Sequence, residues 1–543
     1  MSRRRNGRLG RWAALAALAL SASMADAQAN SDGLDPERLR LGQALYLDGR
    51  RSNGQPLRAR RAGGLSLGGG EAACVNCHRR SGFGGAEGRS YIPPINAASL
   101  LTAKPPGSGA SAAGRPAYTM QSLGRALRQG IDAAGRRLDF LMPRYDLNEA
   151  ELAALFAYLA RLSTQSSPGV TATVVDFATI VAPGMAAQHR QAMLDVLAAC
   201  FAEHNAGRPA ERGRRRLGPE IGFAGQRAWQ LHVWELHGAP DTWEPQLAAH
   251  ARRTPVFAVL GGLGSGQWGP VHNFCEANAL PCLFPHIEVP GAETAGFYSM
   301  YLHKGIPLEA AIIAHDLGRE GPAGQRVIQV RRAGDETARA AAEALRKRLS
   351  RHAIELDERV LDGADDAAFA AALAEIPATT ALVLWLRPPD LRRLASRQPE
   401  AAKLYLSTLL ADPESLALPV AWKERALIAY PYELPEMRTR HTAQLAAWLR
   451  RHALAPVAET LQADAYLACT LLATGMNEIT GHLQPDYLLE RLEVVIERTG
   501  SSGHYPRLAL GAGQRFASKN GYLLRFADPA STRLVPVGER LAP

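Results

Sequence analysis

The pattern Cys-x-x-Cys-His at residues 74–78 is the part of this chain best suited to covalent chemistry. Its two thiols, Cys74 and Cys77, can form thioether bonds to the vinyl groups of haem, and His78 follows where an imidazole can bind the iron. The spacing therefore predicts one covalent haem c with His78 as proximal ligand. Half a zinc site would need a second Cys/His pair, and a thioredoxin-like redox pair would need a surrounding βαβ unit. Neither is visible in the sequence.

A second iron ligand is expected from a methionine, whose thioether raises the reduction potential of a haem. Met142 is the candidate, because it precedes Pro143 in a short loop that a helical pattern follows at 148–162. His78 and Met142 are thus the predicted metal ligands. Met120 is the rival, but it opens another helical pattern, where we expect a core methionine. A Met142 ligand also argues against catalysis at the haem, which needs an open iron position.

Residues 34–163 resemble the class I cytochrome c family, with an entry helix, the haem motif, a Met-Pro loop and a closing helix. The resemblance implies an all-α, iron-containing electron-transport domain. It also implies that a backbone carbonyl in the proline-containing segment 92–95 holds the His78 imidazole.

The N-terminus predicts export. Residues 1–27 combine five arginines, an apolar run at 12–20 and a small-x-small sequence at 25–27, the pattern of a secretory signal peptide. The apolar run is shorter than the roughly 20 residues that span a membrane, and no later segment is long and uncharged enough. We therefore expect a periplasmic protein without a transmembrane segment, in a compartment where disulfides form.

Charge and length bound the remaining chain. Loss of residues 1–27 removes five arginines and one aspartate, so the formal charge of +10 becomes +6. The basic cluster at 212–216 is expected in a solvated loop, and no nucleic-acid partner is predicted. A chain of 543 residues is too long for one core. After a linker at 164–172 we expect a two-lobed domain at 173–500, with residues 501–543 packed on it or extending it.

The long second part reads as α/β, because short strand patterns alternate with helical ones, as in parallel sheets covered on both faces. The predicted strands are 173–180, 256–260, 281–284, 326–330 and 381–386, and the predicted helices are 185–205, 271–279, 308–317 and 336–350.

The segments 255–285 and 297–301 resemble the type 1 periplasmic substrate-binding proteins, which include amino acid and amide receptors of ABC transporters. The resemblance implies two α/β lobes, three crossovers and a ligand in the cleft. Ser265, in a Gly/Ser loop, would be the carboxylate-binding hydroxyl, and Tyr298 and Glu288 are further ligand-binding candidates. Where the family often has another Ser/Thr-rich loop, this chain has His-Ile-Glu-Val-Pro.

A competing pattern, G-x-G-x-x-G, occupies residues 264–269 with Glu288 about 20 residues further on. We do not predict a dinucleotide site there, because the bulky Trp268 stands where a pyrophosphate would approach.

The four other cysteines divide into two pairs. Cys275 and Cys282 are close enough for a small disulfide loop, whereas Cys200 and Cys469 lie in apolar helical patterns and are expected as buried free thiols. No Ser/His/Asp order or paired-carboxylate motif is visible, so we do not predict an enzyme.

Two functions from different classes remain. In the first, the protein is a periplasmic electron carrier whose solute-binding-like domain docks a redox partner, such as a dehydrogenase or another cytochrome, or senses a small organic solute. In the second, it is an ABC-type receptor for an amino acid-like or amide-like solute with an accessory haem domain.

Overall fold

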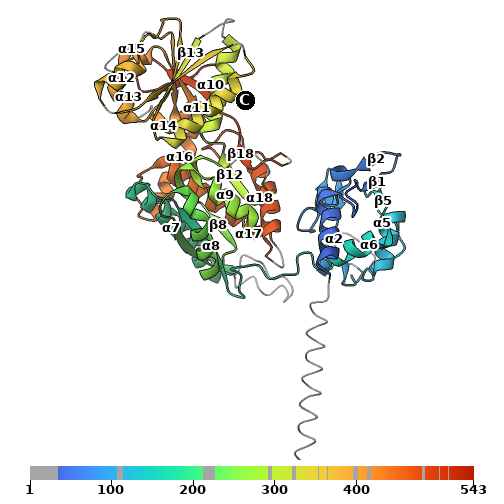
Figure 1. Ribbon diagram of the computed structural model, residues 1–543. Helices are drawn as coiled ribbons and strands as arrows, with labels where there is room; N and C mark the ends of the chain where they lie inside the picture. Colours follow the sequence, from blue (N-terminus) through green and yellow to red (C-terminus); the bar gives the residue numbers. More distant parts are fainter. Residues whose placement is uncertain are drawn as a thin grey trace, which may run out of the picture. The chain divides into compact units, whose positions relative to one another are not determined.

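The computed structural model describes most of the chain after the N-terminal segment (Figure 1). The described residues are 35–106, 114–211, 227–291, 296–320, 326–352, 354–363, 365–395, 401–412, 418–479, 483–500, 502–511 and 513–542. The predicted signal peptide at 1–27 and the basic cluster at 212–216 lie outside them. The chain divides into two compact units between Gln165 and Ser166. Within the described residues, no helix is both long enough and apolar enough to cross a membrane.

The first unit is built mainly from helices. They are α2 (Pro36–Asp48), α3 (Val75–His78), α4 (Ala97–Leu100), α5 (Met120–Gln129) and α6 (Glu149–Leu159). Helices α2 and α6 pack closely, because Gly42 of α2 has no side chain and lies directly against the backbone carbonyl of Ala154. Helix α6 begins with a capping box, in which the side chains of Asn148 and Glu151 satisfy each other's backbone N–H groups.

The expectation of an all-α domain is wrong for this unit. It also contains the antiparallel strands β1 (Arg58–Arg60), β2 (Ser66–Gly68) and β5 (Arg144–Tyr145), and a hairpin of β3 (Gly85–Glu87) and β4 (Ser90–Ile92). Strand β1, the middle strand of this sheet, alternates exposed arginines with the buried Ala59, a period of two that suits a strand with one buried face. Because β5 follows the predicted Met-Pro loop directly, this small sheet fixes one end of that loop.

Lobe 1 of the second unit contains an eight-stranded sheet of order β11-β9-β6-β8-β10-β12-β18, with β7 paired to β6. Its strands are β6 (Val174–Val181), β7 (Ala228–Glu235), β8 (Ala258–Leu260), β9 (Leu263–Gln267), β10 (Cys282–Leu283), β11 (His286–Val289), β12 (Ser299–His303) and β18 (Phe516–Ser518). Its helices are α7 (Ala187–Glu211), α8 (Trp243–Arg253), α9 (Gly269–Ala277), α16 (Pro435–Arg451), α17 (Glu459–Glu478) and α18 (Pro485–Thr499). All pairings in this sheet are parallel.

Lobe 2 contains a seven-stranded sheet of order β14-β13-β15-β16-β17-β19-β20. Its strands are β13 (Arg326–Arg332), β14 (Glu355–Leu361), β15 (Ala381–Trp385), β16 (Lys403–Ser407), β17 (Ala426–Tyr430), β19 (Tyr522–Phe526) and β20 (Leu534–Pro536). Its helices are α10 (Ile306–Glu320), α11 (Glu336–Leu349), α12 (Asp366–Ala372), α13 (Pro388–Ala395), α14 (Thr408–Ala411) and α15 (Val420–Lys423).

Helices cover both faces of the lobe 2 sheet, with α10 and α11 on one side and α12 and α13 on the other (Figure 1). Successive side chains of β13 point to opposite faces of the sheet and pack into two different cores. Ile328 shares a core with Leu391 of α13, whereas Val327 packs with Leu345 of α11. Strands buried on both faces explain the continuous apolar runs that the sequence shows.

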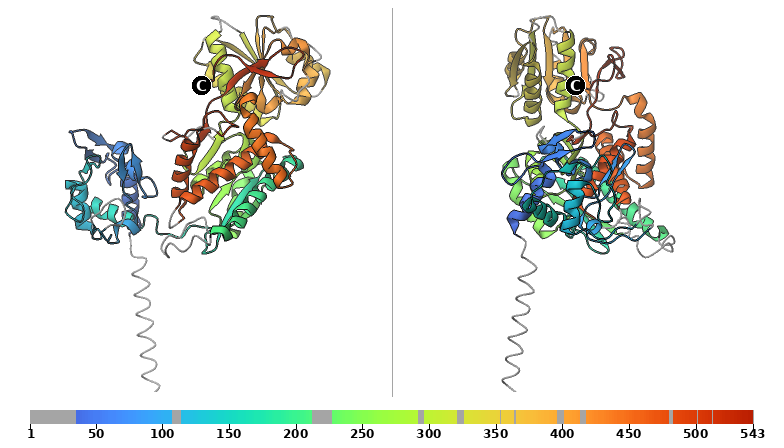
Figure 2. Two further views of the ribbon diagram at one scale, coloured as in Figure 1. Left: turned by 180° about the vertical axis from the view of Figure 1, so that it is seen from behind. Right: turned by 90° about the vertical axis from the view of Figure 1, so that its right-hand side faces the viewer.

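Three crossovers join the lobes, between β12 and α10, between β17 and α16, and between β18 and β19. The predicted C-terminal segment 501–543 thus contributes a strand to the sheet of lobe 1 and two strands to that of lobe 2. Both views in Figure 2 show α17 lying along α7, two helices far apart in sequence.

The contact of α7 with α17 overturns the expectation for Cys200 and Cys469. Both were expected to be free thiols, but they form a disulfide with their Cα atoms 6.6 Å apart. Pairing across 269 residues depends on the packing of two distant helices, which no local pattern reveals. A second disulfide joins Cys275 to Cys282 across the short connection between α9 and β10.

Candidate functional site

The predicted haem ligands line one cavity of about 620 Å³ in the first unit. Cys77 and His78 belong to α3, Cys74 precedes its first residue, and Met142 comes from the loop before β5. Both cysteines are free thiols. Much of the wall is apolar and comes from three helices, the end of β4 and the segment after it, through Ile92, Ile95, Leu100, Leu123, Ala126, Leu127, Leu155 and Leu159.

A backbone carbonyl fixes the His78 ring. Its Nδ1 lies 3.0 Å from the carbonyl oxygen of Pro93, within the segment 92–95 expected to hold it. Burial lowers the pKa of His78 to about 4, although this hydrogen bond opposes the shift, so the ring is neutral at pH 7. Gly84 makes the approach possible, because it has φ +72° and a Cβ there would overlap the carbonyl oxygens of Ile92 and Pro93. With Nδ1 as donor, Nε2 keeps its lone pair, as metal ligation requires.

The two methionines differ in position. Met142 is partly buried against the core of the unit and lines the cavity. Met120, expected in the core, instead begins α5 with 45% of its surface exposed and does not line the cavity. The helical pattern was correct, but the first residue of a helix whose core face begins at Leu123 has little to pack against.

Two cations lie side by side on the cavity wall without a carboxylate partner among the described residues. Lys104 and Arg115 pair through their backbones, and both line the cavity. Burial, and then the charge of Arg115, lower the pKa of Lys104. Arg115 donates to the backbone carbonyls of Ser99 and Pro116 and stacks over Tyr118 at 4.5 Å. The arrangement leaves net positive charge facing the cavity.

A larger cleft of about 1410 Å³ lies between the lobes of the second unit. Its wall comes from the carboxyl ends of strands in both sheets, the position where ligands bind in open α/β folds. Lobe 1 contributes residues after or within β9, β11 and β12, and lobe 2 contributes the loops after β13, β15 and β16.

The three candidate solute contacts have different positions. Ser265 is exposed and lines the cleft, but it lies in β9 rather than in a loop. Glu288 of β11 also lines the cleft. Tyr298 does not: it precedes β12, at the opposite end of the strand from the cleft, and is 8% exposed in the core. The Tyr298 prediction is wrong because an aromatic directly before a parallel strand lies at the amino-terminal edge of the sheet.

The structure of β9 also excludes a dinucleotide-binding turn at the G-x-G-x-x-G pattern. Gly264 and Gln267 pair with Ile287 and Val289 of β11, Gly266 lies between them in β9, and Trp268 is buried in the core of lobe 1. This is not the turn into a helix that cradles a pyrophosphate.

An ion pair joins the two lobes across the cleft. Arg387, just after β15, donates two hydrogen bonds of 2.8 and 3.0 Å to Glu288, and its Nε donates to Asp335 at 2.8 Å. Thr337 of α11 donates to the same Glu288 carboxylate at 2.7 Å. The hydrogen bond with Glu288 raises the pKa of Arg387 above its ordinary value despite burial.

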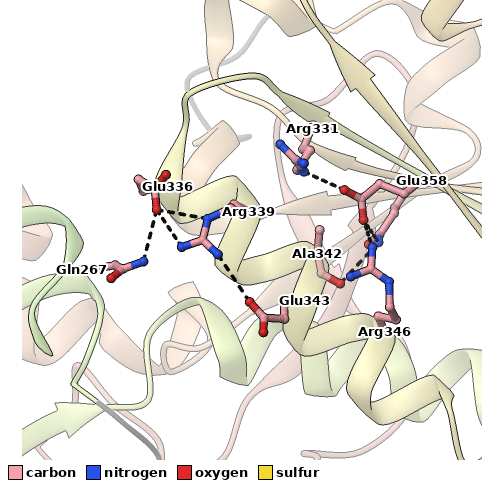
Figure 3. Close-up of polar contacts among 9 residues, drawn as sticks. Gln267, Arg331, Glu336, Arg339, Ala342, Glu343, Arg346 and Glu358 are labelled. Atoms are coloured by element: carbon pink, nitrogen blue, oxygen red, sulfur yellow. Dashed lines mark hydrogen bonds and ion pairs between the residues drawn. The ribbon is translucent and has the colours of Figure 1, made fainter.

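A second bridge lies nearby, where Gln267 of lobe 1 donates to Glu336 at 3.1 Å (Figure 3). Figure 3 also shows Glu336 held from its own helix by Arg339, which reaches on to Glu343. On the other side of α11, Arg331 and Arg346 share Glu358 (Figure 3). Both lobes therefore contribute polar side chains to the same edge of the cleft.

A buried histidine cluster lies at the crossovers and was not predicted as part of the site. His286 binds Asp464 at 2.7 Å, and Tyr505 donates to the other Asp464 oxygen at 2.7 Å. Burial opposes the Asp464 charge, but the His286 hydrogen bond and the neighbouring histidines hold its pKa below the usual value. Burial lowers the pKa of His303 and His504 to about 4.

The members of this cluster come from β11, the end of β12, α17 and the segment after α18. Each looks unremarkable in sequence, because isolated histidines are usually structural, and only the tertiary fold collects them. Within the described residues, no group of three or more His, Cys, Asp or Glu side chains is arranged to hold a metal ion.

No protein-family model and no curated protein matches the chain. Among solved structures, it is similar to a fatty acid ABC transporter substrate-binding protein from Thermomonospora curvata, with TM-score 0.50 and 16% identity over 70% of this chain and 95% of that one. It is also similar to an ABC transporter substrate-binding protein from Aeropyrum pernix, with TM-score 0.51 and 11% identity over 68% of this chain and 97% of that one. Likeness at these identities shows the fold alone. It confirms the predicted two-lobed α/β fold.

Proposed function

We propose that this protein is an exported solute receptor that binds a small organic solute between its lobes and carries one covalent haem c in its first unit. The observation that carries the receptor function is the cleft of about 1410 Å³ at the carboxyl ends of the strands of both sheets. The predicted order of importance is thereby reversed: the two-lobed fold favours solute binding as the main activity, with the haem domain accessory to it.

Equilibrium titration of the full chain with small carboxylates, amides, alcohols and amino acids tests the receptor function. We expect saturable binding of one member of the panel and a smaller radius of gyration when it is bound. Ser265→Ala should weaken that binding, whereas Ser350→Ala, at the end of α11 and outside the cleft, should not. Absence of binding across the panel, with no change in scattering, would count against a receptor.

The haem proposal is supported by the fit of the cavity in the first unit. Two free thiols, a neutral imidazole held through Nδ1 and a thioether line one apolar cavity of about 620 Å³. Lys104 and Arg115 add positive charge suited to the haem carboxylates. When bound, a haem would supply one-electron chemistry. The protein's part is to anchor it through Cys74 and Cys77 and to present His78 and Met142 to the iron.

Production in cells competent for c-type haem maturation tests this proposal. The mass of the denatured chain should exceed the polypeptide mass by one haem, and acid extraction should leave the haem absorbance with the protein. Met142→Ala should remove the near-infrared band of Met-ligated ferric haem and lower the reduction potential. The matched variant Met120→Ala should do neither. If Met120→Ala causes both changes and Met142→Ala does not, then Met120 rather than Met142 is the ligand.

Electron transfer to or from a periplasmic dehydrogenase or another cytochrome is the second candidate function, supported by the same cavity. It makes a different genetic prediction. Deletion of the gene should slow electron flow from a dehydrogenase but leave solute uptake intact, whereas a transport receptor would be needed for uptake. The proposed periplasmic location follows from the N-terminal sequence pattern.

A further inference from the structure

Arg438, in the first turns of α16, is the cleft-lining cation whose charge has no carboxylate partner among the described residues. Its guanidinium is 5.8 Å from the ring of Tyr430, and its buried Nε has no hydrogen-bond partner. An unpaired buried donor on a charged group is costly, so such a group is expected to serve a ligand or a structural anion.

The two other arginines that line the cleft already have acidic partners. Arg332 binds Asp390 and the carbonyl of Gly363 at 2.6 Å. Arg387 is held by Glu288 and Asp335 in the interlobe ion pair. Within the described part of the cleft wall, Arg438 is therefore the cation available to an incoming anion.

The carboxylates of the cleft argue against a ligand ammonium group. Glu288 and Asp335 are only 20% and 13% exposed in their side chains, and both are neutralised by Arg387. Glu336, Glu459 and Asp412 also line the cleft but are exposed, where an ion pair with a ligand gains little, and Glu336 is already paired with Arg339. An amino acid would have to place its ammonium against one of these solvated groups.

Apolar side chains also line the cleft, alongside the polar ones. Leu461 of α17 and Ile287 of β11 are buried, and Leu409, from lobe 2, is partly buried. One available positive charge in a cleft that also exposes apolar surface fits a ligand with one negative group rather than a multiply charged anion.

We infer that the cleft binds a small organic monocarboxylate without an ammonium group, and that Arg438 binds its carboxylate. The inference rests on the proposed receptor function and deepens it by naming the ligand class. An Arg–carboxylate pair is frequently bidentate, which orients the ligand as well as attracting it.

Calorimetric titration of the full chain with matched probes tests the inference. Butyrate, hexanoate, lactate and benzoate would be compared with butyramide, with 2-aminobutyrate and leucine, and with inorganic phosphate. We expect binding of at least one monocarboxylate, at least about tenfold weaker binding of its amide and amino acid counterparts, and weakening with ionic strength. Preference for the amino acids or for phosphate would overturn the inference while leaving a receptor.

Arg438→Gln should weaken carboxylate binding by about 10- to 100-fold. Arg440→Gln, an exposed change on the same helix outside the cleft wall, should alter it by less than about twofold. Arg438→Lys should recover part of the affinity, and it is also the readout if the Gln variant does not fold. Equal affinity in wild type and both Arg438 variants would overturn the inference. Failure of every probe, amino acids included, would count against the receptor function itself.

Discussion

The haem-motif cavity and the interlobe cleft represent two ways of building a site. In the cavity, three of the four reactive groups stand within five residues, and one carbonyl orients the histidine. In the cleft, the wall is assembled from segments between Gly184 and Leu461, and its charges are set by pairs such as Glu288 and Arg387, which are 99 residues apart. The first can be recognised in a sequence, whereas the second exists only once the chain has folded.

The electrostatics of the two regions differ in the same way. The cavity contains a neutral histidine and two cations, Lys104 and Arg115, that no carboxylate of the described residues balances. The cleft neutralises nearly all of its buried charges internally, through Arg387 and the Asp464 cluster, and leaves Arg438. The cavity thus suits the proposed haem, which would stay attached and bring its own charges, and the cleft suits the proposed solute, which would bind reversibly.

Removal of both attachment thiols should give the largest effect. Cys74→Ser with Cys77→Ser should abolish covalent haem, because no thioether can form, and mass spectrometry of the denatured chain measures this directly. Solute binding by the cleft should keep its affinity. A large change in that affinity would break the comparison, since it would mean that the regions act as one site.

Removal of the long-range disulfide should destabilise the second unit selectively. Cys200→Ser with Cys469→Ser should lower its free energy of unfolding by about 2 to 5 kcal/mol, because the unfolded chain regains the entropy of a large loop. Urea unfolding followed by tryptophan fluorescence measures the loss. Cys275→Ser with Cys282→Ser closes a far shorter loop and should cost less. A shift in the unfolding of the first unit would contradict this assignment.

Acid should weaken the second unit through its buried histidines. His303 and His504 have folded pKa values of about 4 and an ordinary value near 6.5. Between these limits the unfolded state binds more protons, so stability rises with pH and is lost as the pH falls from 6.5 to 4. His504→Gln should flatten this dependence in thermal melts, and the exposed change His237→Gln should not. If wild type and His504→Gln had identical pH profiles, protonation of His504 would not lower the stability of the folded state.

A smaller effect is expected at the buried Glu309 of α10. It accepts hydrogen bonds from Ser407 and from the backbone of Leu409, which lines the cleft, and burial raises its pKa to about 8. The folded state binds more protons than the unfolded state between pH 4.5 and 8, so stability falls as the pH rises. Glu309→Gln should remove this fall and stabilise lobe 2 at pH 8 relative to the wild type, measured by denaturant unfolding. Destabilisation at pH 8 would indicate a charged glutamate.

The sequence predicts the fold wherever a pattern is local. The strand expected at 173–180 is β6 (Val174–Val181), and the helix expected at 336–350 is α11 (Glu336–Leu349). Strand β7 was missed, since its burial does not alternate cleanly and its hydrophobic residues mix with His232 and Glu235. The Gly/Ser segment was expected to be a loop because glycine disfavours strands, but its pairing with β11 overrides that preference.

The candidate sites follow the same rule. The residues at 74–78 and Met142 could be named from spacing, and they line one cavity. Ser265 and Glu288 could be named from a family resemblance, and both line the cleft. Tyr298 could not be assigned correctly, because strand direction decides whether it lies at the cleft edge of the sheet or at the opposite edge. Arg387 and Asp464 carry no sequence signal because their partners are tertiary, and Arg438 carries none because only the fold places it on the cleft wall.

The way the chain's final strands are shared has a consequence for biosynthesis. Strand β18 pairs with β12 in lobe 1, and β19 lies between β17 and β20 in lobe 2. Neither sheet can therefore be completed until residues beyond 515 have been synthesised, although most of both lobes precedes them. A nascent chain in this condition lacks a finished cleft throughout most of translation. For the export proposed above, such late closure would keep the polypeptide incompletely folded, as passage through a translocation channel requires.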